Sequence, residues 1–151
     1  MIDLSNVNAY RESIQIEAKK SLGGLPKSLW ETYSAFANAE GGVILLGVEE
    51  LKDRSLHPVD LPDPDALIRE FWEIVNDPAR VSANILSTAA ITWIEFEGKD
   101  VIAIEVPQAE PKDRPVYVGG DPFTGSYIRR GDGDYRCTPE EVRQMLAKAK
   151  K

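Results

Sequence analysis

The hydrophobic pattern of the chain changes its period several times, and each change predicts a new element. Apolar and polar residues alternate near residues 12–20, which is typical of a half-buried strand. Residues 26–39 open with a proline and carry apolar side chains at helical spacing, which predicts a helix. The run 43–48 is apolar apart from one glycine and predicts a buried strand. Gly41 and Gly42 suit the turn between them, because glycine takes positive φ at little steric cost.

The middle of the chain predicts a second helix and then a hairpin. Asp63 and Pro64 have the order of an N-cap and a first-turn proline, and the helix that they open is predicted to end at residues 76–78. The alternating runs 91–96 and 101–106 flank a short segment with a central glycine, which permits the chain to reverse.

The C-terminal part predicts short strands and a last helix. Residues 107–125 are rich in Pro, Gly and Asp and contain a candidate short strand at 116–118. A further strand is predicted at 126–130. Thr138 then has the proline and glutamate of a capping box after it, which predicts a helix over about 139–149.

Length and element order define the fold class. The 151 residues are enough for one domain with a buried core, which we place at residues 1–151. Strands and helices follow one another without regular alternation, so we expect an α+β fold with a mixed sheet and about three helices. No uncharged run is long enough to cross a membrane, and the N-terminus has no leader pattern, so we expect a cytoplasmic protein. A single cysteine excludes an internal disulfide.

Charge is unevenly distributed along the chain. The net charge of −7 disfavours nucleic acid as a partner. Residues 1–39 are neutral, residues 40–110 carry −10 and residues 111–151 carry +3. The C-terminal third could therefore form a local basic face that attracts phosphate, although a solvated surface of mixed charge is an equal alternative.

Four segments, taken in order, resemble the Schlafen AlbA-type family of domains, which are described as DNA-binding. They are residues 12–19, 35–50, 127–131 and 138–142, and the match spans about residues 10–147. The most specific positions are Phe36, Asn38, Gly41, Gly42 and Gly47. The resemblance implies a bacterial stand-alone domain that acts as a nucleic-acid-binding or transcription-regulator-type module, without an ATPase or helicase domain.

Three glutamates are candidates for a metal site on the same resemblance. In animal Schlafen proteins a metal-dependent RNase uses a carboxylate pattern that Glu12, Glu17 and Glu50 match in spacing. Such a set would hold Mg²⁺ or Mn²⁺, which prefer oxygen ligands. Residues 12 and 17 point to opposite faces of a regular strand, so both reach one site only if the strand bends or begins after Glu12. The alternative is that Glu12 is solvated and Glu17 pairs with Lys19.

Basic and aromatic residues are candidates for contact with DNA or RNA. On the predicted strand 126–130, a tyrosine and an arginine share one face, where the ring could stack on a base while the guanidinium binds phosphate. The alternative is an arginine paired with Glu17 or Glu50. The candidate nucleic-acid-binding residues are Lys19, Arg114, Tyr127, Arg129, Arg130 and Arg136.

Three functions therefore remain open at this point: a nucleic-acid-binding regulatory module, a metal-dependent endoribonuclease, and a protein-interaction module that uses the acidic residues 40–110. We also expect a symmetric homodimer, because two copies would double the arginines that face one ligand. The strand at 126–130 or the hairpin at 91–106 is the predicted contact.

Overall fold

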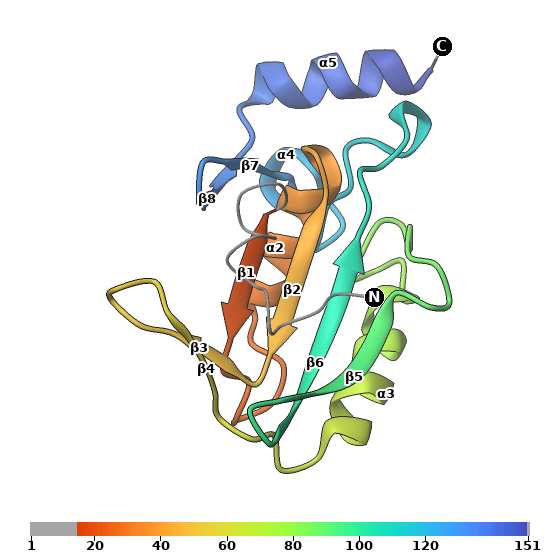
Figure 1. Cartoon of the computed structure of the whole chain (residues 1–151). Coiled ribbons are helices and arrows are strands. Elements are labelled where there is room, and N and C mark those ends of the chain that lie inside the picture. The colour runs from red at the N-terminus through yellow and green to blue at the C-terminus, as the bar shows by residue number, and fades with distance from the viewer. Residues whose placement is uncertain (1–14, 151) are drawn as a thin grey trace.

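A four-stranded mixed sheet lies at the centre of the computed structural model, which describes residues 15–150 (Figure 1). Its strands are β1 (Ile16–Lys19), β2 (Gly42–Leu46), β6 (Lys99–Val106) and β5 (Ile91–Phe96), in that spatial order. β1 runs parallel to β2, whereas the other two pairs are antiparallel. The mixed sheet with its surrounding helices confirms the predicted α+β class.

Two helices cover one face of this sheet and form the main core with it. α2 (Ser28–Asn38) and α3 (Pro64–Val75) pack their buried aromatic and aliphatic residues against β2 and β6. Phe36 and Phe71 from the two helices are almost completely buried. α3 begins as predicted, because the Asp63 carboxylate accepts a hydrogen bond from the backbone N–H of Ala66 at 3.1 Å. None of the helices in residues 15–150 is long and apolar enough to cross a membrane.

The strand predicted at residues 43–48 is divided at Gly47. Gly47 has a φ of +84°, and the chain leaves the main sheet there. The next strand, β3 (Val48–Glu50), pairs with β4 (Leu56–Pro58) in a separate two-stranded hairpin that projects from one side of the molecule (Figure 1). A Cβ atom at Gly47 would lie 2.6 Å from Cγ of Leu61, so the position requires glycine for space as well as for its backbone conformation.

The C-terminal part forms a second hairpin and a last helix. β7 (Tyr127–Arg130) and β8 (Gly133–Arg136) are antiparallel, and α5 (Pro139–Ala149) follows them. The capping box at the start of α5 is formed as predicted, between Thr138 and Glu141. The first strand of this hairpin confirms the prediction at residues 126–130.

Two short helical segments precede this hairpin, η2 (Pro111–Asp113) and the one-turn helix α4 (Pro122–Gly125). The segment 116–118 was predicted as a short strand, and this is wrong: it makes only isolated bridges, from Val118 to Val81 and from Tyr117 to Ser126.

Asn38, near the end of α2, attaches the C-terminal part to the rest of the fold. Its side-chain amide donates to the backbone carbonyls of Val116 and Tyr127, both at 2.9 Å. Its side-chain oxygen accepts from the backbone N–H of Val116 at 2.8 Å. Ser34, one turn earlier, accepts from the backbone N–H of Tyr127 at 2.9 Å. These bonds fix the start of β7 against α2.

Candidate functional site

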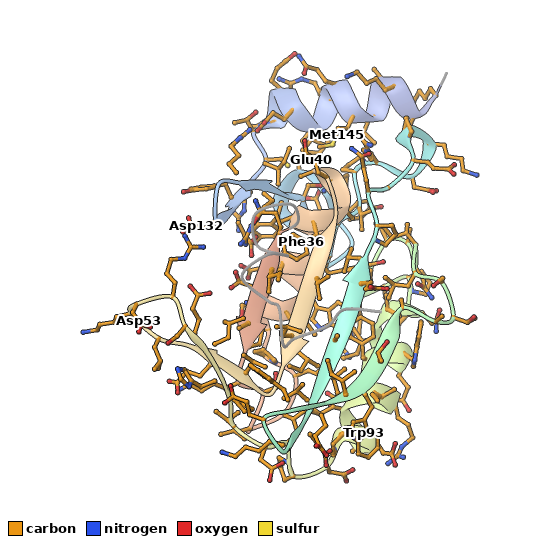
Figure 2. The ribbon with its side chains drawn as sticks, viewed as in Figure 1. Phe36, Glu40, Asp53, Trp93, Asp132 and Met145 are labelled. Atoms are coloured by element: carbon orange, nitrogen blue, oxygen red, sulfur yellow. The ribbon has the colours of Figure 1, made fainter. Side chains whose placement is uncertain are left out.

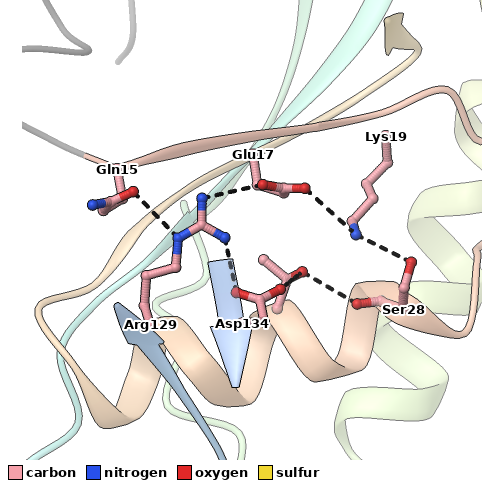
Figure 3. Close-up of polar contacts among 7 residues, drawn as sticks. Gln15, Glu17, Lys19, Ser28, Arg129 and Asp134 are labelled. Atoms are coloured by element: carbon pink, nitrogen blue, oxygen red, sulfur yellow. Dashed lines mark hydrogen bonds and ion pairs between the residues drawn. The ribbon is translucent and has the colours of Figure 1, made fainter. Parts of the chain in front are cut away.

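Arg129, on β7, is the centre of a buried polar network (Figure 3). Its guanidinium forms ion pairs with Glu17 at 3.1 Å and with Asp134 at 2.8 Å, and it donates to the Gln15 side chain at 3.3 Å. It also lies 5.1 Å from the ring centroid of Phe36. Only 4% of the Arg129 side chain is exposed. The pairing of an arginine with Glu17 is thus the alternative that the structure shows.

The network continues from β1 to α2. Lys19 lies 3.8 Å from the second carboxylate oxygen of Glu17 and donates to the Ser28 hydroxyl at 3.1 Å. Asp134 accepts from the Thr32 hydroxyl at 2.6 Å. The predicted contact between Glu17 and Lys19 is therefore present. Glu17, Lys19 and Arg129 together join the first strand, the first helix and the second hairpin, and their charges satisfy one another inside the fold.

Two of the three predicted metal ligands line one pocket. The pocket has a volume of about 260 Å³ and contains Glu17, Glu50 and Asp132 beside Arg54 and Arg129. It lies between the β3–β4 turn and the β7–β8 turn, which face the same side of the molecule (Figure 2). Its three carboxylates are thus accompanied by two guanidinium groups. Such a site is close to neutral.

A metal site needs ligands that are not already neutralised by cations. Among residues 15–150, no group of three or more His, Cys, Asp or Glu side chains could hold a metal ion. Glu12, the remaining predicted ligand, lies outside the described residues. The described part of the chain therefore does not by itself supply a Mg²⁺ or Mn²⁺ site.

The β3–β4 turn brings Asp53, Ser55 and His57 together. The Ser55 hydroxyl donates to Asp53 at 2.5 Å and lies 2.8 Å from Nε2 of His57. In a catalytic triad the acid orients the histidine and the histidine contacts the nucleophile, whereas here both partners contact the serine. The hydrogen bond from Ser55 lowers the pKa of the Asp53 carboxyl. This arrangement stabilises the turn and does not activate the serine.

A second recess, on the other side of α2, concentrates positive charge around aromatic side chains. Its volume is about 450 Å³, and it lies between the first turn of α2, the segment after α3, and the start of β7. We call it the basic recess and define it by Lys27, Trp30, Ile74, Arg80, Tyr127 and Arg136. Glu31 is the one carboxylate among its lining residues.

The three cations of the basic recess reach the solvent, and one of them, Arg136, also interacts with Tyr127 and Glu31. Lys27, Arg80 and Arg136 are exposed. Within residues 15–150 none of the three takes part in an ion pair, in contrast to Arg129 and Arg130. Three cations against one carboxylate give the recess a positive charge, although the whole chain is acidic.

Tyr127 and Arg136 occupy opposed positions of the β7–β8 hairpin. The Arg136 guanidinium carbon lies 6.0 Å from the centroid of the Tyr127 ring. A hydrogen bond with Tyr127 is the main cause that raises the pKa of Arg136. The pair presents a ring and a guanidinium to the same space, which suits a ligand that carries both a flat base and a phosphate.

The structure thus separates the predicted nucleic-acid-binding residues into groups. Tyr127 and Arg136 line the basic recess, whereas Lys19 and Arg129 belong to the buried network. Arg130 is exposed and forms an ion pair with Glu141. The remaining candidate, Arg114, donates to the backbone carbonyl of Ala109 at 2.8 Å.

Sequence reasoning missed Lys27 and Arg80. They are distant from each other and from Tyr127 in the chain, and neither lies in a run of basic residues. The one signal in the sequence is that both residues lie near the ends of predicted helices. This signal is weak, because exposed basic side chains are common at such positions.

A family model and a solved structure each match most of the chain. The model of the family "Schlafen, AlbA_2" matches residues 12–138. The solution structure of the N-terminal domain of a RecG-related protein from Nitrosomonas europaea, a protein named for an ATP-dependent DNA helicase, is 31% identical with a TM-score of 0.60. That match covers 89% of this chain and 90% of the other.

A second solved structure shares the fold at lower identity. The DIP2311 protein from Corynebacterium diphtheriae is 20% identical with a TM-score of 0.55, over 84% of this chain and 22% of the other. This chain therefore spans about a fifth of that protein. No curated protein matches the chain. The family match and the relative from Nitrosomonas europaea show that the chain belongs to the Schlafen AlbA_2 family.

Proposed function

We propose that this domain binds nucleic acid through the basic recess and serves as a cytoplasmic, transcription-regulator-type module. The observation that carries the proposal is the set of three cations, Lys27, Arg80 and Arg136, that line one recess with Tyr127 and face a single carboxylate there, that of Glu31. Affinity for nucleic acid depends on such cations, because each phosphate contact releases counterions. The family and the name of the Nitrosomonas europaea relative support a nucleic-acid ligand.

A binding module is favoured over a motor. Lys27-Ser28 follows the glycine pair Gly23-Gly24, but two residues separate them, whereas a phosphate-binding loop has a glycine directly before the lysine. Gly41 and Gly42 instead serve the turn between α2 and β2, where a Cβ atom on either would lie 2.7 Å from a neighbouring atom. The helicase description of the relative is therefore not extended to this chain.

The test measures binding of labelled DNA and RNA across a salt series. Lys27→Ala, Arg80→Ala and Arg136→Ala should each weaken binding, and each should reduce the slope of log affinity against log salt by about one. Arg143→Ala is the matched control, because Arg143 is an exposed arginine on α5 whose partner is Glu140. Recess variants that keep the affinity and slope of the parent would favour the acidic protein-interaction module instead.

A second candidate function is cleavage of RNA with Mg²⁺ or Mn²⁺. The observation in its favour is that Glu17 and Glu50 line the same pocket. The ion pair between Glu17 and Arg129 opposes it, because a paired carboxylate is a poorer metal ligand. Incubation of the protein with RNA and each metal decides the matter, and intact RNA under all conditions would exclude the nuclease.

A homodimer is proposed through the outer edge of β5. This strand is at the edge of the main sheet, and its Trp93 side chain is 47% exposed. An exposed edge strand is a template for pairing with a second copy. Light scattering should report twice the mass of 16.8 kDa at micromolar concentration. Trp93→Lys should restore the monomer mass, and a monomer mass for the parent would contradict the proposal.

A further inference from the structure

We infer that the basic recess holds an unpaired nucleotide, with its base inside the recess and its neighbouring phosphates on the three cations. The inference rests on the proposed function and names the form of nucleic acid that this site selects: single strands over duplexes. It follows from the shape of the recess, the chemistry of its floor and the placement of its charges.

The recess is an open depression with enough room for a base. Its volume of about 450 Å³ falls within the range of roughly 300–1,000 Å³ that is usual for such pockets. A protein that contacts only the phosphates of a duplex needs an exposed row of cations and no depression. A base within a duplex is stacked on both sides, so only an unstacked base can enter a recess.

The floor of the recess is apolar and aromatic. Trp30 and Ile74 are buried residues of α2 and α3 that still line the recess. Trp30 is held in place by stacking on Phe71, with ring centroids 4.9 Å apart. Tyr127 is half-buried at the start of β7 and offers its ring on the same recess. Flat aromatic and aliphatic groups of this kind suit the faces of a base and have no role in binding phosphate.

The charges lie on separate elements around this floor. Lys27 is the N-cap residue of α2, Arg80 follows α3, and Arg136 ends β8. The positive end of the α2 dipole adds to the same side. A nucleotide with phosphates on both sides of its sugar can reach cations on more than one of these elements while its base points into the recess. A ligand with only one charged group, such as a free carboxylate, would contact only one of the three cations.

The experiment compares three probes of about ten nucleotides: single-stranded oligothymidine, the same strand with abasic sites in place of the bases, and a duplex that contains it. The abasic strand keeps every phosphate and lacks the bases. The parent protein should bind the intact single strand on the order of tenfold more tightly than the abasic strand or the duplex. The variants are Ala79→Trp and Ala79→Ser, because Ala79 is an exposed residue that lines the recess.

Ala79→Trp fills the recess and leaves its charges unchanged. It should lower affinity for the intact single strand to that for the abasic strand, and leave the affinity for the abasic strand as it is. Ala79→Ser should behave as the parent, and thermal unfolding of both variants checks that the fold is retained. Equal affinity for all three probes, with no effect of Ala79→Trp, would overturn the inference and leave the proposed function intact. No binding to any probe would overturn both.

Discussion

Glu17 on β1 and Arg129 on β7 form an ion pair of 3.1 Å between side chains that are 112 positions apart in the chain. The pair joins the first strand of the main sheet to the second hairpin. Because Arg129 is almost fully buried and also paired with Asp134, its positive charge is used within the fold. The sequence made Arg129 a candidate phosphate ligand, but its contacts in the fold give it a structural role.

Arg129→Ala should therefore reduce stability more than it reduces binding. Removing the arginine leaves the carboxylates of Glu17 and Asp134 without their cation, so we expect a loss of about 3 kcal/mol in the free energy of unfolding. Urea denaturation measures it. Arg130→Ala is the control: its side chain is 52% exposed, so its pair with Glu141 should contribute less than about 1 kcal/mol. Equal losses for the two variants would contradict the structural role of Arg129.

Asn38→Ala should destabilise the attachment of the second hairpin. The substitution removes the side-chain partner of the Val116 N–H and of the Tyr127 carbonyl, whereas the Val116 carbonyl still accepts from the Ser34 hydroxyl, so the expected loss is about 3 kcal/mol. Asn76→Ala is a suitable comparison, because Asn76 is exposed: it donates to the Trp72 carbonyl and accepts from the Asn84 side chain, and both bonds are open to solvent. If both asparagines cost the same on thermal unfolding, the clamp at Asn38 is not formed as described.

Gly41→Ala should be far more costly than Gly23→Ala. Gly41 has a φ of +80°, and a Cβ atom there would lie 2.7 Å from the backbone oxygen of Val106. Backbone cannot move aside as a side chain can, so we expect a loss of more than about 2 kcal/mol. A Cβ atom at Gly23 meets nothing within 4 Å, and its φ is not in the left-handed region. Chemical denaturation of both variants measures the two losses of stability. The loss for Gly41→Ala should be the larger, and equal losses would contradict the described turn.

Tyr33 should make stability fall at alkaline pH. Burial raises the pKa of its phenol from 10.0 to about 12. Below pH 10 the phenol is neutral in both the folded and unfolded states, so it causes no pH dependence there. As pH rises from 10 towards 12, the unfolded state loses the proton before the folded state does, and the folded state loses relative stability.

Tyr33→Phe removes this titration. The variant lacks the hydrogen bonds of the phenol to Ala83 and Ile85, so it should be less stable than the parent at neutral pH. The difference between the two proteins should then become smaller as pH rises above 10. Unfolding free energies measured in urea from pH 8 to 12 test this, and a difference that is constant with pH would show that Tyr33 is not buried as described.

The secondary structure was readable where its cause is local. The cap at Asp63, the capping box at Thr138 and the hairpin of β5 and β6 each depend on residues within a few positions of one another, and all three are present. The same reasoning missed the division at Gly47, because it predicted one continuous strand over residues 43–48. Strand geometry continues on both sides of that glycine, and only its φ of +84° and the separate pairing of β3 with β4 show that the main sheet ends there.

The role of each charged residue was decided by tertiary contacts. The alternation of residues 127–130 shows that Tyr127 and Arg129 share a face, but not that this arginine meets Glu17 and Asp134. Pairing energies depend on distance and burial, which a one-dimensional pattern does not contain. Binding to phosphate and pairing with a carboxylate were both physically sound roles for these arginines. The contacts in the fold decide between the two.

The sequence by itself determined the α+β class, the main helices, the hairpin of β5 and β6, and the family, because these depend on local periodicity and on short motifs such as the one around Asn38 and Gly41. Only the tertiary structure brought Lys27, Arg80 and Arg136 to one recess. These residues come from three elements far apart in the chain. Their charges add up at one place because the packing of α2, α3 and the second hairpin brings them together, and no property of the separate segments requires it.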